Sequence, residues 1–289
     1  MYKSEYKGKG GIEAKVVAHS EYAGTEIHTL ELKYPRFIHA EFMTHRVFSR
    51  NASSSRAIPT DKLLKQIAEY PAMPIHWGKN QPGMQAREEL PDGSIEWLNA
   101  AVDASKYARS FNQAGYHKQI VNRITEPYQF IKVVVTATEW DNFFKLRLHE
   151  DAQPEIYELA RCMFEAMQNS DPKYLEEDKW HLPYILEGER IQVPVEILRR
   201  ASVGRCARVS YQNHDNTKPL IEKDISLHDM LLDAGHMSPF EHQAKPMPLE
   251  PVWIQDGGVV FESGVTHLDK LGIPWSGNFR NFIQYRQIL

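Results

Sequence analysis

The first pattern in the chain is a loose alternation of apolar and polar positions over 13–32, with β-branched residues at Val16, Val17, Ile27 and Thr29. Successive side chains of a strand point to opposite faces of a sheet, so an alternation that carries β-branched residues is typical of β-strands. We therefore predict two short strands in this stretch.

Helical spacings follow further along the chain. Apolar residues fall at the spacing of a helix over 37–43, and 99–122 is also predicted to be helical. The run 131–140 fits a β-strand or the start of a buried helix, because a short apolar run has no period that separates the two. A strong amphipathic helix is predicted after Pro154, with an apolar stripe formed by Ile156, Leu159, Ala160, Met163, Phe164 and Met167.

The segments between these elements predict the organisation of the chain. Residues 49–60 are rich in Ser and Asn and are predicted to form a loop, and the proline-rich residues 61–98 an irregular excursion. An apolar, basic helix is predicted near 193–201. Because no clean linker interrupts the chain, we expect one domain over 1–289, divided into a front block 13–60, an insertion at about 61–110, core helices 111–170 and a C-terminal block at about 200–289.

Composition limits the class of protein. The chain has 289 residues, 34 Lys and Arg against 38 Asp and Glu, a formal net charge of −4 and 42% hydrophobic residues. These values exclude a disordered chain and a coiled coil. The near-balanced charge argues against nucleic acid or a membrane surface as a partner, although a local basic pocket for a small anion remains compatible with it.

Cysteine usage and apolar runs indicate the compartment. Cys162 and Cys206 cannot form a disulfide framework, and we expect both to be buried, reduced thiols. The first ten residues have no apolar stretch of the secretory kind, and no apolar run approaches 18 residues. We therefore expect no membrane span, and a cytoplasmic protein in a reducing compartment.

Three arginines are the strongest candidates for chemistry. Ser54, Ser55 and Arg56 place hydroxyls, loop amides and a guanidinium together, a set that suits a phosphate, although a solvated Ser-rich loop would have the same composition. Arg123 lies among apolar residues just before a proline. Arg147 lies in an apolar stretch, so it is paired with Glu150 or Asp151 or is held against a ligand.

Two blocks of sequence resemble the flavin-dependent thymidylate synthases. Residues 44–56, THRVFSRNASSSR, resemble the family signature Arg-His-Arg, seven residues, Ser, then Gly-Arg-Tyr. Residues 142–160, NFFKLRLHEDAQPEIYELA, are similar to a second family block, and Arg123 with Pro127 matches an Arg-x-x-x-Pro element. Two further family motifs, ARVS at 207–210 and GHMSPFEH at 235–242, lie near the C-terminus here, whereas the family carries them before Arg-His-Arg. The chain is therefore identified as a divergent, circularly permuted member.

The resemblance implies a fold, a reaction and a set of ligands. It implies an α/β (α+β) fold with helices packed on a curved mixed sheet, assembled as a homotetramer or dimer. It implies FAD as cofactor, with methylenetetrahydrofolate and NADPH as co-substrates, and the conversion of dUMP to dTMP. The permuted order predicts that segment 235–242 packs against the segment that contains His45, within a subunit or across an interface.

The resemblance also implies roles for individual residues. The implied flavin-site residues are His45, Arg46, Asn51, Thr136, Thr138, Asn142, Ser210, His236, Ser238 and Glu241. The implied nucleotide-site residues are Glu41, Thr44, Ser54, Ser55, Arg56, Arg123 and Arg147. Among them, Arg147 and Ser54 are the implied catalytic residues, and Arg147 would face the pyrimidine ring.

Departures from the family pattern keep alternatives open. Thr44 stands in place of the first Arg of the signature and Glu41 in place of a Gln, while Ala52 replaces an acid and Ala57 a Tyr. These differences leave open a dUMP or dCMP hydroxymethylase or methylase, and a non-catalytic nucleotide- or flavin-binding protein. A metal-dependent hydrolase that uses His236, Glu241 and His242 is a third alternative; otherwise no metal ion is expected.

Overall fold

A computed structural model describes residues 4–209, 220–255 and 258–289 of the chain. Its main sheet has the strand order β1-β2-β3-β5-β4, and β6 pairs with β2 in parallel while the other neighbours are antiparallel. The strands of this sheet are β1 (Glu5–Lys7), β2 (Glu13–Tyr22), β3 (Thr25–Pro35), β4 (Ser49–Ala52), β5 (Phe130–Ala137) and β6 (Lys173–Tyr174). Two strands are thus confirmed within 13–32, and the second extends to Pro35.

Strand β5 lies inside the sheet and is buried on both faces. Ile131, Val133 and Val135 point into the largest apolar core, whereas Val134 and Thr136 point to the opposite side. A strand that is covered on both faces has no polar alternation, which is why the run 131–140 could not be assigned from its pattern alone. The structure resolves this ambiguity in favour of a strand.

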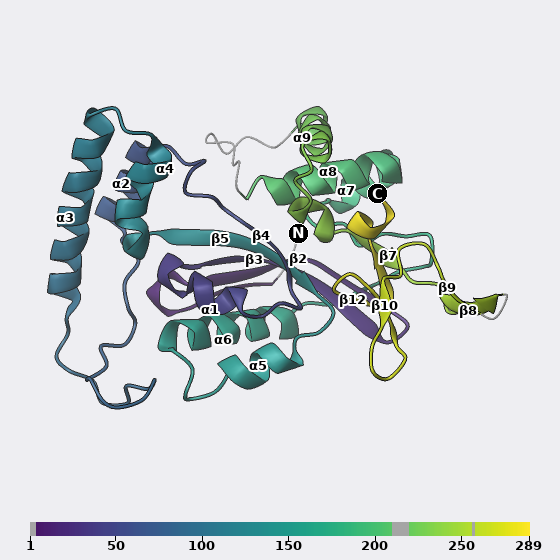
Figure 1. Cartoon of the computed structure of the whole chain (residues 1–289), viewed down its shortest axis with the longest axis horizontal. Coiled ribbons are helices and arrows are strands. Elements are labelled where there is room, and N and C mark those ends of the chain that lie inside the picture. Colours follow the sequence, from purple (N-terminus) through teal and green to yellow (C-terminus); the bar gives the residue numbers. More distant parts are fainter. Residues whose placement is uncertain (1–3, 210–219, 256–257) are drawn as a thin grey trace.

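One face of the sheet is covered by α5 (Asp141–Arg147) and α6 (Pro154–Gln168), as Figure 1 shows. The helix predicted after Pro154 is confirmed, and its stripe is buried at Ile156, Leu159, Ala160 and Met163. Full burial of one such large apolar side chain contributes about 1.5–3 kcal/mol, so this face holds α6 firmly in place.

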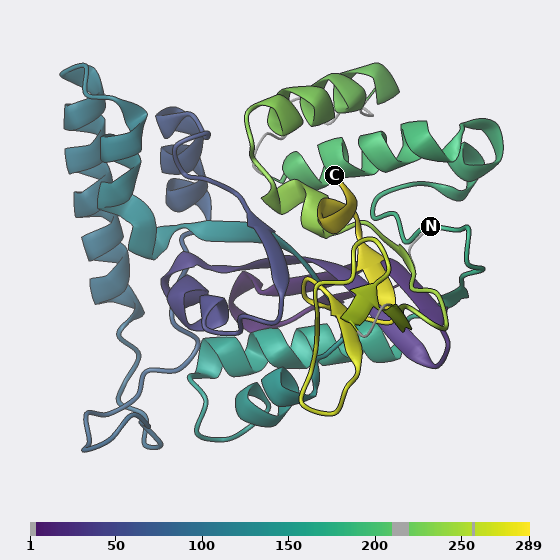
Figure 2. The ribbon, with the colours of Figure 1, turned by 45° about the vertical axis from the view of Figure 1, so that its right-hand side comes forward.

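A helical arm stands beside the sheet (Figures 1 and 2). It consists of α2 (Thr60–Glu69), α3 (Ser94–Gln113), α4 (Lys118–Val121) and the 3₁₀ helix η3 (Asn122–Tyr128). The prediction of an irregular stretch over 61–98 was wrong at both ends. Leu63, Leu64 and Ile67 are buried at helical spacing in α2, which ends before the first proline of the stretch.

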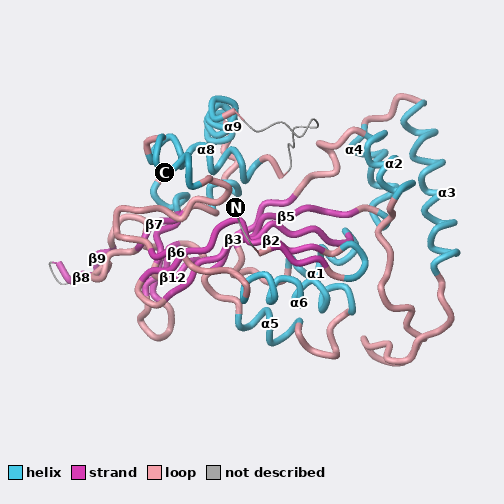
Figure 3. The backbone as a smooth tube through the Cα atoms, turned by 180° about the vertical axis from the view of Figure 1, so that it is seen from behind, coloured by secondary structure: helices cyan, strands magenta, loops and turns pink. Residues whose placement is uncertain are grey.

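The opposite side of the sheet carries the C-terminal part of the chain (Figure 2). Its helices are α7 (Glu187–Gln192), α8 (Val195–Ala207), α9 (Ile221–Asp233) and the short 3₁₀ helices η4 (Ser238–Glu241) and η5 (Tyr285–Ile288). The helix predicted near 193–201 is confirmed and is longer than expected. Small strands complete this part: β7 (Ala244–Pro246), β8 (Val252–Gln255), β9 (Gly258–Phe261), β10 (His267–Leu268), β11 (Pro274–Ser276), β12 (Phe279–Arg280) and β13 (Phe282–Gln284). Figure 3 shows β8 and β9 far from the main sheet.

A chain of buried polar groups joins the sheet to this C-terminal part. The hydroxyl of Thr136 lies 2.7 Å from that of Thr29 and 2.8 Å from Nδ1 of His242. Thr29 also lies 2.8 Å from Nε2 of His181, whose Nδ1 is 2.9 Å from the hydroxyl of Ser20. All five side chains are buried. Because an unpaired buried polar group costs about 1–3 kcal/mol, this chain of contacts fixes how the two parts meet.

Both cysteines are free and buried, as predicted. Burial raises the pKa of the Cys162 thiol to about 12 and also raises that of Cys206. Neither sulfur is therefore a thiolate nucleophile near neutral pH. Within the described ranges, every helix is too short or too polar to serve as a membrane span.

The close packing of α8 on α9 depends on Gly204. A Cβ added there would lie 2.3 Å from the backbone oxygen of Asp224. Gly204→Ala is expected to lower the free energy of unfolding by about 1–3 kcal/mol, the usual effect of overpacking. Gly188→Ala in α7 is the control, because nothing lies within 4 Å of its Cβ position, and alanine favours a helix by up to about 1 kcal/mol. Urea denaturation midpoints measure both, and equal midpoints would contradict the close approach.

Candidate functional site

The short helix α1 (His39–Met43) presents the first group of candidate residues. It follows the 3₁₀ helix η2 (Arg36–Ile38) and ends at Thr44, whose hydroxyl donates to the backbone oxygen of Glu41 at 2.7 Å. His45 follows in the next turn and is 8% exposed. The aromatic ring of Phe143 packs edge-on against its imidazole with ring centres 4.8 Å apart, which fixes the plane of the imidazole.

Arg147, at the end of α5, contacts this turn directly. Its Nε donates to Nε2 of His45 at 2.9 Å, and a terminal nitrogen donates to the hydroxyl of Thr44 at 3.4 Å. The pairing of Arg147 with Glu150 or Asp151, one of the two sequence-based interpretations, is not what the structure shows: both acids lie near Arg87, at 3.7 and 3.6 Å. Among the described residues, no carboxylate lies within ion-pair distance of Arg147.

The electrostatics of His45 leave the charge of Arg147 uncompensated. Burial, followed by the positive charges of Arg147 and Arg50, lowers the pKa of His45 to about 4. His45 is therefore neutral at pH 7 and accepts the hydrogen bond from the guanidinium. A guanidinium that is held by a neutral imidazole keeps its full charge and its remaining donors for an anionic ligand.

The motif GHMSPFEH at 235–242 lies against β4. The hydroxyl of Ser238 donates to the side-chain oxygen of Asn51 at 3.2 Å, and the amide nitrogen of Asn51 donates to the backbone oxygen of Cys206 at 2.9 Å. The predicted packing of segment 235–242 against the segment that contains His45 is confirmed by this contact. The circular permutation itself stays an expectation.

Two other residues of these C-terminal motifs, Glu241 and His236, have different surroundings. Glu241 pairs with Arg286, while burial raises the pKa of its carboxyl group. His236 is exposed after the end of α9. Ser210 lies outside the described residues.

The candidate phosphate site centres on an acid that sequence reasoning missed. The hydroxyl of Ser55 and the guanidinium of Arg123 both contact Oε1 of Glu126, at 3.3 and 2.8 Å, and Arg36 contacts the same oxygen at 3.0 Å. The spacing of three between Arg123 and Glu126 was a signal for this pair, because residues three apart are neighbours on one side of a helix. An incoming phosphate would compete with this carboxylate for its donors.

Two further candidate arginines, Arg46 and Arg56, face solvent. Arg46 and Arg56 are exposed, and neither pairs with a carboxylate in the described part of the chain. The half-buried hydroxyl of Ser54 accepts from the backbone nitrogen of Arg56 at 3.3 Å, which shapes the turn that carries this arginine. The exposed ends of both guanidinium groups are therefore accessible to a ligand.

The remaining flavin-site candidates lie in β5, directly after it and in α5. Thr136 is fully buried between Thr29 and His242, so its hydroxyl is already hydrogen-bonded. The hydroxyl of Thr138 accepts from the backbone nitrogen of Arg280 at 3.0 Å. Asn142 is exposed in the first turn of α5.

Glu41 lines a separate cavity of about 680 Å³. The cavity lies between α1, the loop before α3 and the start of α6, with Arg87 and Trp97 in its wall. Oε2 of Glu41 is buried and has no hydrogen-bond partner. None of the other candidate site residues lines this cavity. This cavity therefore does not bring Glu41 together with Ser54, Ser55 and Arg56.

The metal site considered from sequence is not formed. His242 is fully buried with Nδ1 bonded to Thr136, whereas His236 is exposed. His236, Glu241 and His242 do not bring their ligand atoms together in the described part of the chain. This arrangement removes the basis for a hydrolase that uses these three residues.

Comparison with known proteins covers the part of the chain that contains His45, Arg123 and Arg147. The sequence model of the thymidylate synthase complementing protein family matches residues 17–173, more than half of the chain. No curated protein matches the chain. The matched region contains His45, Arg123 and Arg147, whereas the motifs at 207–242 lie beyond it. The matched region carries the turn in which Arg147 is held by His45, so the motif resemblance and the family match agree. The chain belongs to this family, that of the flavin-dependent thymidylate synthases.

Proposed function

We propose that the protein transfers a one-carbon group from methylenetetrahydrofolate to C5 of a pyrimidine deoxynucleotide, converting dUMP to dTMP with FAD as cofactor and NADPH as reductant. Family membership supports thymidylate synthase-type activity. The observation that carries the proposal for this chain is the guanidinium of Arg147, which is held by a neutral imidazole and has no carboxylate partner among the residues that the structure describes.

The donor set fits FAD. The pyrophosphate of FAD is an anion, and the exposed guanidinium of Arg46 suits it because arginine offers a planar fork of donors. Ser238 and Asn142 are exposed polar groups that suit the rest of the cofactor, and Asn51 holds Ser238 in position. These residues would hold FAD together with His45. Bound there, FAD supplies the redox chemistry that no protein side chain offers.

Each protein group then has a defined task. Arg147 stabilises negative charge that develops on the pyrimidine ring as C5 becomes nucleophilic, and His45 keeps its guanidinium in place. Arg56 and the hydroxyl of Ser54 bind the phosphate. Arg123 and Ser55 join them when the phosphate replaces the Glu126 carboxylate as their partner.

A second copy of the chain completes the site in this proposal. The cavity that holds Glu41 contains none of the phosphate-binding candidates, so this cavity does not enclose a whole nucleotide. An assembly of two or four copies would place the exposed Arg46 and Arg56 of one copy against another. The site would then lie between subunits, as the family resemblance implies.

The reaction is tested by tritium release from dUMP labelled at C5, with methylenetetrahydrofolate and NADPH present. We expect release that depends on FAD, and absorbance of a bound flavin in the purified or reconstituted protein. Omission of the folate is the control, because the carbon donor must take the place of the label. Flavin and nucleotide binding without release would favour the non-catalytic alternative, and a protein that binds neither would overturn the proposal.

The role of Arg147 is tested by replacement with Lys and with Ala. A lost contact to developing charge costs about 2.7–4 kcal/mol, roughly 100- to 1,000-fold in rate, and Lys lacks the planar fork. We expect both variants to lose that much turnover while FAD binding and melting temperature stay nearly unchanged. Arg200→Lys is the control, since Arg200 pairs with the carboxylate of Asp229 and a point charge suffices there. Near-normal turnover in Arg147→Lys would contradict the assignment.

A second substrate is favoured by Glu41. The buried, unpartnered Oε2 of its carboxylate suits a ligand that carries a hydrogen-bond donor, such as the exocyclic amine of cytosine. This observation keeps a dCMP-directed enzyme, methylating or hydroxymethylating C5, as the alternative. Mass spectrometry of the nucleotide product would distinguish a hydroxymethylated base from a methylated one.

Glu41→Gln separates the two substrates. A hydrogen bond to a charged group contributes about 1.5–3 kcal/mol, roughly 10- to 150-fold. If the carboxylate binds a cytosine amine, kcat/KM of the variant for dCMP should fall by that factor. The ratio of kcat/KM for dUMP to kcat/KM for dCMP should rise. Equal effects on kcat/KM for the two nucleotides would show that Glu41 does not select the base.

A further inference from the structure

Strand β2 contains an irregularity that changes which of its side chains face α6. Ala14 pairs with Leu32 and Val16 with Leu30, and all four side chains lie in the core under α6. The register then shifts between Val16 and Ala18, which is a β-bulge. A bulge adds one residue to a strand and so re-aims the side chains that follow it.

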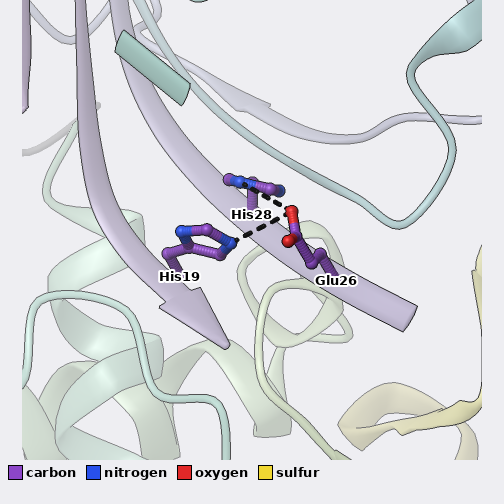
Figure 4. Close-up of side chains that lie close together, drawn as sticks. All are labelled: His19, Glu26 and His28. Atoms are coloured by element: carbon purple, nitrogen blue, oxygen red, sulfur yellow. Dashed lines mark ion pairs between the residues drawn. The ribbon is translucent and has the colours of Figure 1, made fainter. Parts of the chain in front are cut away.

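The bulge places two histidines side by side. Without it, Ala18 would stand opposite His28; with it, His19 pairs with His28 across β2 and β3. Their imidazole rings stack with centres 3.7 Å apart. Glu26 precedes His28 by two residues on the same strand, so its side chain lies on the same face. Figure 4 shows the carboxylate of Glu26 beside both rings.

The polar atoms of this group lie close together. Oε2 of Glu26 lies 3.3 Å from Nε2 of His19 and 3.7 Å from Nε2 of His28, and the ligand atoms all lie within 4.8 Å of one another. Nε2 of His19 is buried and has no hydrogen-bond partner, and neither has Nδ1 of His28. Donors on a tetrahedral zinc ion, with bonds of about 2.0–2.1 Å, stand about 3.4 Å apart, close to the two measured separations.

A contact behind His19 suits the role of a metal ligand. Nδ1 of His19 lies 2.6 Å from the hydroxyl of Ser170, and this contact orients the ring so that Nε2 faces Glu26. In metal-bound histidines, the nitrogen that does not bind the metal is usually hydrogen-bonded in the same way.

We propose that His19, Glu26 and His28 form a binding site for a divalent transition-metal ion, for which zinc is the best match. Two imidazole nitrogens and one carboxylate oxygen provide three ligands from adjacent positions of one antiparallel pair. The side chain of Glu26 is 51% exposed, so a solvent molecule can occupy the fourth position. Hard cations such as Mg²⁺ prefer oxygen ligands alone and are not expected to bind.

This site is separate from the proposed active site. His28 contacts Trp140, with ring centres 6.5 Å apart, and Trp140 in turn packs against Phe48 next to His45. Trp140 and Phe48 therefore lie between the metal ligands and His45, whereas the flavin-site candidates Thr136 and Thr138 flank Ala137, which pairs with His28. Failure of the metal proposal would leave the proposed function untouched.

The test is zinc binding by protein without an affinity tag of histidines. Isothermal titration with Zn²⁺ and metal analysis after gel filtration are expected to give one zinc per chain, and Co²⁺ in its place should give the visible absorption of a tetrahedral ion. Glu26→Gln preserves shape at an exposed position and should weaken zinc binding by more than about 10-fold. Ser170→Ala should weaken it by roughly 10- to 100-fold, the usual effect of losing a second-shell partner.

The matched control is Glu89→Gln. Glu89 lies 2.8 Å from Nδ1 of His76, so the variant breaks another histidine–carboxylate pair on the same protein without touching the proposed ligands. It should bind zinc like the unaltered protein, and circular dichroism should confirm that all variants are folded. No retained zinc in the unaltered protein, or equal affinities in Glu26→Gln and Glu89→Gln, would overturn the proposal.

Discussion

The hydroxyl of Thr136 lies between Thr29 and His242, and this buried contact joins the centre of the sheet to the C-terminal part of the chain. A buried hydroxyl that lost either partner would cost about as much as a typical core mutation, so the two parts have one favourable way to meet. Asn51 and Ser238 meet as part of the same arrangement. The relative positions of the candidate flavin residues therefore depend on a contact that need not touch any ligand.

The arginines of the site are held in two different ways. Arg147 is oriented by a neutral imidazole, which fixes its direction and leaves its charge uncompensated. Arg123 is oriented by the carboxylate of Glu126, which neutralises it until another anion takes over. The first arrangement suits a group that must act on small changes of charge in a ring. The second suits a group that must release and recapture a phosphate, because the exchange replaces one anion with another.

The sequence pattern predicted helices and strands that are buried on one face only. It could not predict contacts between residues that lie far apart in the chain. The stripe of α6 was predicted correctly except at Phe164, which is 39% exposed, because one face of the helix is buried and the other is not. Strand β5 was ambiguous because it is buried on both faces. The sequence left the partner of Arg147 open between nearby acids and a ligand. It could not show that both acids lie near Arg87, which comes from a distant loop. The pairing of His19 with His28 depends on the register of two strands and on a bulge, neither of which leaves a recognisable spacing in the sequence.

The burial of both sulfur atoms has a practical consequence. With Cys162 and Cys206 fully covered and their pKa values raised, neither native thiol is a ready target for thiol-directed alkylating or oxidising reagents. A cysteine introduced on the exposed surface of α3 would therefore react alone. The natural sequence is thus already suited to site-specific attachment of a fluorophore or spin label, with no need to remove its own thiols first.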